Sequence, residues 1–167
     1  CLANRNKTLG TINDLRPLEV FDQYVSRAVQ DIARRREKLD ATSGVRLLEN
    51  IAARMWDLGT TTLALEDSGI GDEQLESAVS MYSDLRAASI LREESPDGDE
   101  HSRSVRFTYD ELCEYMLGRS WHRVVEKAGQ RKGGRTVDDI VDAALARLEF
   151  SPTMGALVFL QRMHGTE

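Results

Sequence analysis

The pattern of apolar and polar residues along this chain is predominantly helical. From Pro17 onward, apolar side chains recur at steps of three and four residues, the spacing that places them on one face of an α-helix. The same spacing returns in five later stretches. We therefore expect six helices, beginning near Pro17, Ser43, Asp72, Thr108, Thr136 and Ser151.

Residues that cap helices support several of these starts. Ser43 precedes an apolar stripe and is a favoured N-cap residue. Thr108 is followed three residues later by Glu111, and Thr136 by Asp139, which predicts a capping box at each of these two sites.

A different pattern separates the third and fourth helices. Residues 90–93 and 103–107 read as two short strands, and a Pro and an Asp-Gly between them predict a turn or loop. Val105 and Phe107 alternate with charged neighbours, so one face of this hairpin should be buried and the other exposed to water.

The order of these elements is that of a winged helix. Residues 43–108 supply a helix, a short strand or extended arm at Leu63 and Leu65, another helix and the hairpin. We predict a mainly α fold with a central winged-helix unit containing one β-hairpin at about 90–108. The predicted domains are a helical lead-in at 1–42, a winged-helix-like domain at 43–128 and a helical hairpin at 129–167.

Composition narrows the class of protein. The 167 residues are 41% hydrophobic and 30% charged, a globular balance, and the net charge is −6. Two cysteines without a Cys-x-x-Cys pair indicate a reduced, cytoplasmic protein. No apolar run approaches the roughly 20 residues that span a membrane, so we expect no membrane association. Because the chain begins with Cys1, we interpret it as a piece of a longer protein.

Charge also argues against DNA binding through the winged helix. The helix before the hairpin and the hairpin loop would contact DNA in such a domain, yet both are rich in Asp and Glu. We therefore expect no nucleic-acid partner for these surfaces.

The sequence contains no motif typical of a catalytic or metal-binding site. The three histidines are isolated and predict no metal site, and Cys113 lies among apolar residues, as a buried structural cysteine does. Gly133-Gly134 beside Arg131 and Lys132 is not a Walker A motif. We predict no catalytic and no metal-binding residue in this chain.

One basic run could form a functional surface. Its plainer interpretation is a solvated helix end with a basic loop, and its alternative is contact with phosphate, nucleic acid or an acidic neighbouring domain. Besides Arg119, its members are Arg123, Lys127, Arg131, Lys132 and Arg135.

The junction between the hairpin and the following helix carries a family resemblance. Residues 105–117, VRFTYDELCEYML, resemble the strand-to-helix junction of winged-helix domains in STAND NTPases, especially NACHT-type proteins. That junction has an aromatic residue, a polar residue and His before a helix with Glu-Tyr or Glu-Phe. The likeness extends over about residues 1–128, with 1–39 resembling the end of the NTPase module and 130–167 the start of a following helical region.

The resemblance implies a regulatory role without catalysis in this segment. It would couple nucleotide state to sensor binding, in prokaryotic antiviral defence or signalling. ATP or ADP and Mg are implied for the full-length protein, with an upstream NTPase module, a downstream sensor and a homo-oligomer on activation. The family's nucleotide-contacting His aligns with Tyr109, whose hydroxyl can hydrogen-bond phosphate but carries no positive charge. The alternatives are a free-standing helical protein-protein adaptor and a winged-helix transcription regulator.

Overall fold

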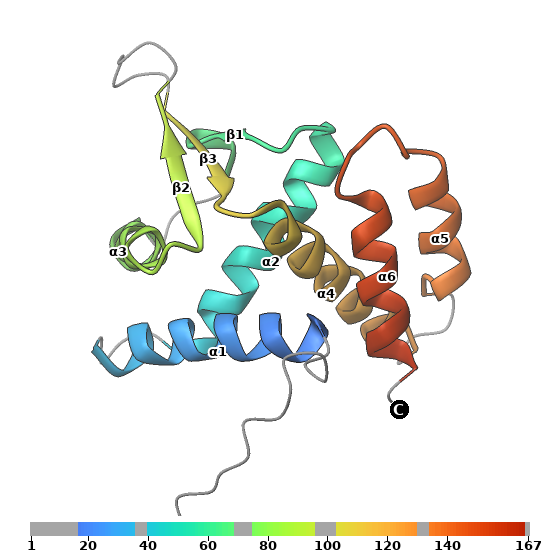
Figure 1. The fold of residues 1–167 in the computed structure, drawn as a ribbon, viewed down its shortest axis with the longest axis horizontal. Helices are drawn as coiled ribbons and strands as arrows, with labels where there is room; N and C mark the ends of the chain where they lie inside the picture. Colours follow the sequence, from blue (N-terminus) through green and yellow to red (C-terminus); the bar gives the residue numbers. More distant parts are fainter. Residues whose placement is uncertain (1–16, 36–39, 69–74, 96–102, 130–133, 166–167) are drawn as a thin grey trace, which may run out of the picture.

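Helices dominate the computed structural model, which describes residues 17–35, 40–68, 75–95, 103–129 and 134–165 (Figure 1). The mainly α class predicted from the sequence is confirmed. The described helices are α1 (Pro17–Arg35), α2 (Ala41–Leu58), the 3₁₀ turn η2 (Glu66–Ser68), α3 (Leu75–Ala87), α4 (Asp110–Gly129), α5 (Val137–Leu145) and α6 (Thr153–His164). The strands are β1 (Leu63–Ala64), β2 (Leu91–Glu94) and β3 (Ser104–Phe107).

The elements predicted for the winged-helix unit occur in the expected order, as α2, β1, α3, β2 and β3, and the 3₁₀ turn η2, which was not predicted, lies between β1 and α3. The three strands are antiparallel in the order β1-β3-β2, with Leu63 opposite Val105 and Leu91 opposite Phe107. These four side chains are buried, at 0–2% exposure, because all of them lie on the inner face of the sheet. The predicted hairpin, its inward face and the short strand at Leu63 are therefore confirmed.

One hydrophobic cluster joins this unit to the helices around it. It contains Val25, Val29 and Ile32 of α1, Leu48 and Ile51 of α2, and buried residues of α4, α5 and α6. In Figure 1, α1 runs along one end of α2, and α6 lies beside α4. The predicted division at residues 42 and 128 stays a prediction, and the described parts of the three ranges share this core.

Close approach of α4 and α6 depends on a glycine. A Cβ placed on Gly118 would lie 2.9 Å from the carbonyl oxygen of Ala156 and 2.9 Å from Cβ of Phe159. A side chain at this position would push the two helices apart, since neither of these atoms can move without the backbone of α6. This contact positions α4, which carries the residues of the candidate site.

Two predicted helix starts are wrong in detail. Asp40, and not Ser43, is the N-cap of α2: its carboxylate accepts from the Ser43 N–H at 2.7 Å. The capping box at Thr108 and Glu111 is not formed, since α4 begins at Asp110 and the buried Thr108 hydroxyl has no hydrogen-bond partner within the described residues.

The other predicted starts agree more closely with the structure. At α5 the predicted capping box of Thr136 and Asp139 is confirmed, with the Thr136 N–H donating to Asp139 at 2.7 Å. The last helix begins at Thr153, two residues later than predicted. The predicted start at Asp72 lies outside the described residues.

Within the described residues, no helix is both long and apolar enough to cross a membrane.

Candidate functional site

Tyr109 lies in the two-residue link between β3 and α4. Phe107, directly before the link, is 2% exposed and Leu112 in the first turn of α4 is fully buried, whereas Tyr109 is 56% exposed. The link is held by a hydrogen bond from the Thr108 N–H to the Ile90 carbonyl at 3.0 Å. The Tyr109 side chain is therefore presented to solvent from a fixed backbone.

The surroundings of Tyr109 are aromatic and acidic. Tyr24 of α1 is a neighbour of Tyr109. The pKa of Tyr24 is raised mainly by burial, and in addition by the charge of Tyr109. Asp110 and Glu111 follow in the first turn of α4 and are exposed. The Tyr109 hydroxyl can donate a hydrogen bond to an acceptor in solvent or on a neighbouring module.

The predicted basic run does not form one surface among the described residues. Lys127 and Arg135 are exposed, Arg123 is partly buried and turned toward α2, and Arg131 and Lys132 lie outside the described residues. The structure therefore separates Arg123 from the exposed members of the run.

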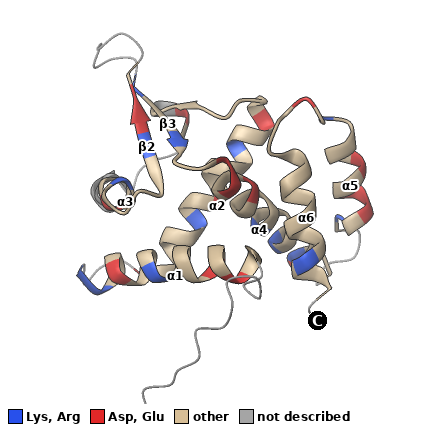
Figure 2. Cartoon of the chain, in the orientation of Figure 1, with Lys and Arg blue, Asp and Glu red and all other residues tan. Residues whose placement is uncertain are grey.

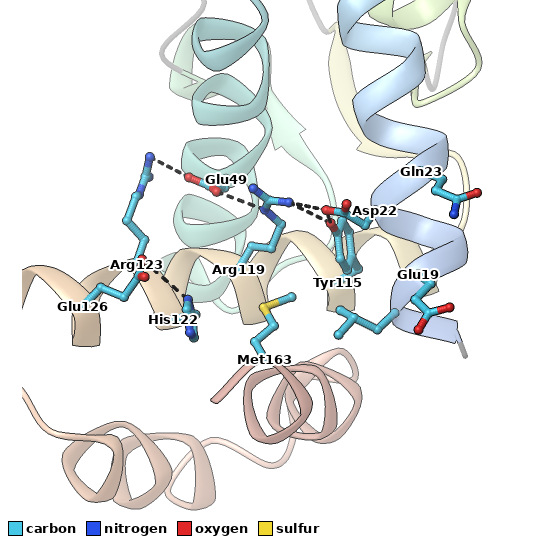
Figure 3. Close-up of a pocket in the computed structure, with 11 residues that line it drawn as sticks. Glu19, Asp22, Gln23, Glu49, Tyr115, Arg119, His122, Arg123, Glu126 and Met163 are labelled. Carbon is cyan, nitrogen blue, oxygen red and sulfur yellow. Dashed lines mark hydrogen bonds and ion pairs between the residues drawn. The ribbon is translucent and has the colours of Figure 1, made fainter. Parts of the chain in front are cut away.

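Arg123 instead belongs to a buried ion-pair network that the sequence did not predict. Its centre is Glu49 of α2, whose side chain is only 4% exposed. Arg123 Nη1 lies 2.6 Å from Glu49 Oε2, and Arg119 Nε lies 3.4 Å from Glu49 Oε1 (Figure 3). Two guanidinium groups of α4 thus neutralise one buried carboxylate of α2, as burial of a charge requires.

The network continues to α1. Arg119 Nη1 lies 2.7 Å from Asp22 Oδ1, and the Tyr115 hydroxyl donates to the same oxygen at 2.7 Å. Burial raises the pKa of Tyr115, so this phenol stays neutral and acts as a donor. Burial alone lowers the pKa of Arg119, but the hydrogen bond to Tyr115 and the charges of Glu49 and Asp22 outweigh it and raise that pKa. The charged form of Arg119 is therefore favoured.

Aromatic packing holds the same junction together. Phe21 of α1 stacks on Tyr115 of α4, with ring centroids 5.9 Å apart, and meets Phe159 of α6 edge-on at 5.8 Å. The Tyr115 and Phe159 rings also meet edge-on, at 5.5 Å. These three rings and the ion-pair network together join α1, α4 and α6.

Two hollows adjoin Glu49, Arg119 and Arg123, which line both of them. The larger, about 460 Å³, lies among α1, α2, α4 and α6 and also holds the carboxylates of Glu19, Asp22 and Glu126. The smaller, about 300 Å³, lies among α1, α2 and α4 and adds a third arginine, Arg46. The larger hollow is therefore acidic and the smaller one basic.

The position of Glu49 in the sequence indicates a buried charge that needs a partner. It stands one turn after Val45 and one turn before Ala52, within the apolar stripe of α2, where a charged residue requires a partner. Arg119 and Arg123 are likewise one turn apart on α4, in line with the buried Tyr115. Sequence alone did not show that these two stripes face each other.

The sheet carries a second set of ion pairs. Glu93 contacts Arg86 and lies 3.5 Å from Arg103. Figure 2 shows acidic and basic positions side by side on β2 and β3. In a DNA-binding wing, arginines at such positions would contact phosphate. Here the arginines form ion pairs with glutamate instead. The same holds for the next glutamate of β2, Glu94, which contacts Arg92 and Arg106.

Cys113 is buried, as predicted. It is 3% exposed, its Sγ lies 4.0 Å from the Met55 sulfur, and burial raises its pKa to about 12. A thiol with this pKa is almost entirely protonated near neutral pH and is a poor nucleophile. Among the described residues, no group of three or more His, Cys, Asp or Glu side chains is arranged to hold a metal ion.

Comparisons with protein-family models, with curated proteins and with solved structures found no match to this chain.

Proposed function

We propose that this chain is the non-catalytic relay segment of a STAND-type ATPase. The observation that carries the proposal is the position of Tyr109. In the stretch that resembles the family junction, Val105, Phe107, Leu112 and Tyr115 are buried, while Tyr109 is 56% exposed. An exposed hydroxyl on a fixed backbone suits contact with a nucleotide held by a neighbouring module.

The shared core supports a mechanical role. Residues of α1 lie in the same hydrophobic cluster as those of α2, α4 and α6, and the Glu49 network ties three of these helices together. A displacement of one end of such a packed body moves the other end, because packed interiors do not deform continuously. The segment would thus carry a change of nucleotide state to a downstream sensor.

The proposal assigns the chemistry to other parts of the protein. ATP or ADP and Mg would bind to an upstream NTPase module, and a downstream sensor domain would bind the activating ligand. The activated protein would be a homo-oligomer acting in the cytoplasm, in prokaryotic antiviral defence or signalling. This chain would contribute Tyr109 and no catalytic residue.

The test uses the longer protein that the proposal implies. Its sequence should contain a Gly-rich P-loop upstream of Cys1. Removing the hydroxyl by Tyr109→Phe should weaken retention of ADP and raise basal activity, with the melting temperature unchanged. Tyr24→Phe is the matched control, an exposed neighbouring tyrosine whose hydroxyl donates within the chain to the Ala88 carbonyl. Absence of a P-loop, or equal ADP retention in both variants, would overturn the proposal.

A second candidate function is a helical protein-protein adaptor. It is favoured by large apolar side chains exposed on α5, the turn after it and α6, since such groups often mark interaction surfaces. They are Leu145, Leu148, Met154 and Val158, at 52%, 50%, 56% and 42% exposure. An intact protein without a P-loop that binds a partner through these residues would establish the adaptor function instead.

A further inference from the structure

The smaller hollow beside Glu49 has the charge and size of an anion site. It measures about 300 Å³, near the lower end for small-molecule sites. Three guanidinium groups and one carboxylate line it, which leaves a net charge of +2 in a chain whose overall charge is −6. The positive groups come from two elements: Arg46 from α2, and Arg119 and Arg123 from α4.

The arginines retain hydrogen-bond donors after pairing with Glu49. A guanidinium has five N–H donors. Arg123 meets Glu49 through Nη1, and Arg119 uses Nε and Nη1 for Glu49, Asp22 and Tyr115. Arg46 forms no ion pair with any residue that the structure describes. Donors therefore remain on all three side chains.

Glu49 holds two of these groups in place before any ligand arrives. Its carboxylate is buried and cannot leave the arginines without becoming an unpaired buried charge. The heads of Arg119 and Arg123 are thereby fixed, and a fixed donor loses less conformational entropy when it binds. Ser26 and Gln30 of α1 add a hydroxyl and an amide to the same hollow.

We propose that this hollow binds a compact phosphate dianion, either free inorganic phosphate or the phosphate of a small phosphomonoester. Three guanidinium groups match the several acceptor oxygens of a phosphate better than the two of a carboxylate. The larger hollow, with four carboxylates and two arginines, has the wrong sign for this ligand. Tyr109 does not line either hollow, so this site is independent of the proposed function.

The test is a titration of residues 1–167 with inorganic phosphate, with AMP and with acetate, at constant ionic strength, followed by amide NMR. Phosphate and AMP should bind saturably at millimolar concentration, shifting amides near Ser26, Arg46 and Arg123, and acetate should bind more weakly. Tighter binding of phosphate than of AMP assigns free phosphate as the ligand, and tighter binding of AMP assigns a phosphomonoester. Equal affinity means that the site recognises the phosphate group alone.

Variants distinguish a built site from general attraction. Arg46→Gln should weaken phosphate binding by about tenfold, the loss expected for a hydrogen bond between charged groups, without lowering the melting temperature. Arg54→Gln is the matched control: it removes an exposed arginine from the same helix, two turns away and outside the hollow. No saturation with phosphate, or equal weakening by both substitutions, would overturn the proposal.

Discussion

Two glutamates of this molecule each lie between two arginines, one on the sheet and one between helices. Glu93 of β2 contacts Arg86 and Arg103, whose side chains are 45% and 42% exposed. Glu49 of α2 contacts Arg119 and Arg123, which are 30% and 25% exposed, and is itself 4% exposed against 14% for Glu93. The chemical groups are the same, and their access to water differs.

Burial changes what each set of ion pairs does. Water and salt screen the sheet pairs, so these contribute little to stability and their partners are easily replaced by solvent. The Glu49 carboxylate has no such substitute, because only 4% of its side chain is exposed to water. The helical junction is therefore where charge fixes the fold, while the sheet depends on its apolar inner face.

The largest expected effect tests the apolar side of this comparison. Phe107→Ala should lower the free energy of unfolding by about 3–5 kcal/mol, since it removes a buried ring between β3 and the helices. Urea denaturation of residues 1–167 measures the change. Tyr109→Phe, two residues away and exposed, should leave the midpoint unchanged. An unchanged midpoint for Phe107→Ala would mean that the strand register is wrong.

Removal of the buried carboxylate should have the next largest effect. Glu49→Ala leaves two guanidinium groups facing each other without their shared partner, and should cost about 3 kcal/mol in the same denaturation experiment. Glu126→Ala is the control, because it removes an exposed glutamate of α4. A cost no greater than that of the control would contradict the assigned role of Glu49.

The corresponding change on the sheet should be smaller. Glu93→Gln keeps the size of the side chain and removes its charge. It should cost at most about 1 kcal/mol, the usual range for ion pairs that solvent can reach, because both arginines of this set are more than 40% exposed. The cost should shrink further as salt is added. Denaturation at low and high ionic strength measures both effects. A large cost that salt does not reduce would place Glu93 in the same class as Glu49.

The smallest expected effect concerns the pH dependence of stability at Glu114 of α4. The pKa of Glu114 is raised above its ordinary value of 4.5, mainly by burial and to a smaller extent by the charges of Glu111 and Asp110. The charged form is thus disfavoured in the folded state, a cost present at neutral pH and lost as pH falls through the raised pKa. Glu114→Gln should raise the melting temperature slightly at neutral pH and not at acidic pH, and an equal rise at both would contradict this assignment.

Local patterns predicted much of the fold. Alternation at Val105 and Phe107 indicated the inward face of the hairpin, and the spacing of Thr136 and Asp139 indicated the cap of α5, because both depend on neighbours a few residues away. The start of α2 was misplaced because Asp40 and Ser43 are both good capping residues, and only the backbone at Asp40 decides between them.

The candidate site was harder to predict because its partners are distant in sequence. Glu49 and Arg119 are 70 residues apart, and their pairing depends on how α2 and α4 pack. Arg123, one turn further along α4, was grouped with Lys127 by proximity in sequence. Helix packing instead turned Arg123 toward Glu49 and left Lys127 exposed. Periodicity identifies a buried face but does not identify what it faces.

The most direct test of this comparison is a pair of double-mutant cycles on residues 1–167, one joining Glu49 to Arg123 and the other joining Glu93 to Arg103. Each cycle isolates the interaction energy of its pair from the other effects of the two substitutions. The buried pair should show about 2–3 kcal/mol of coupling and the sheet pair less than about 1 kcal/mol. Equal coupling in the two cycles would contradict the conclusion that the helical junction, and not the sheet, is fixed by charge.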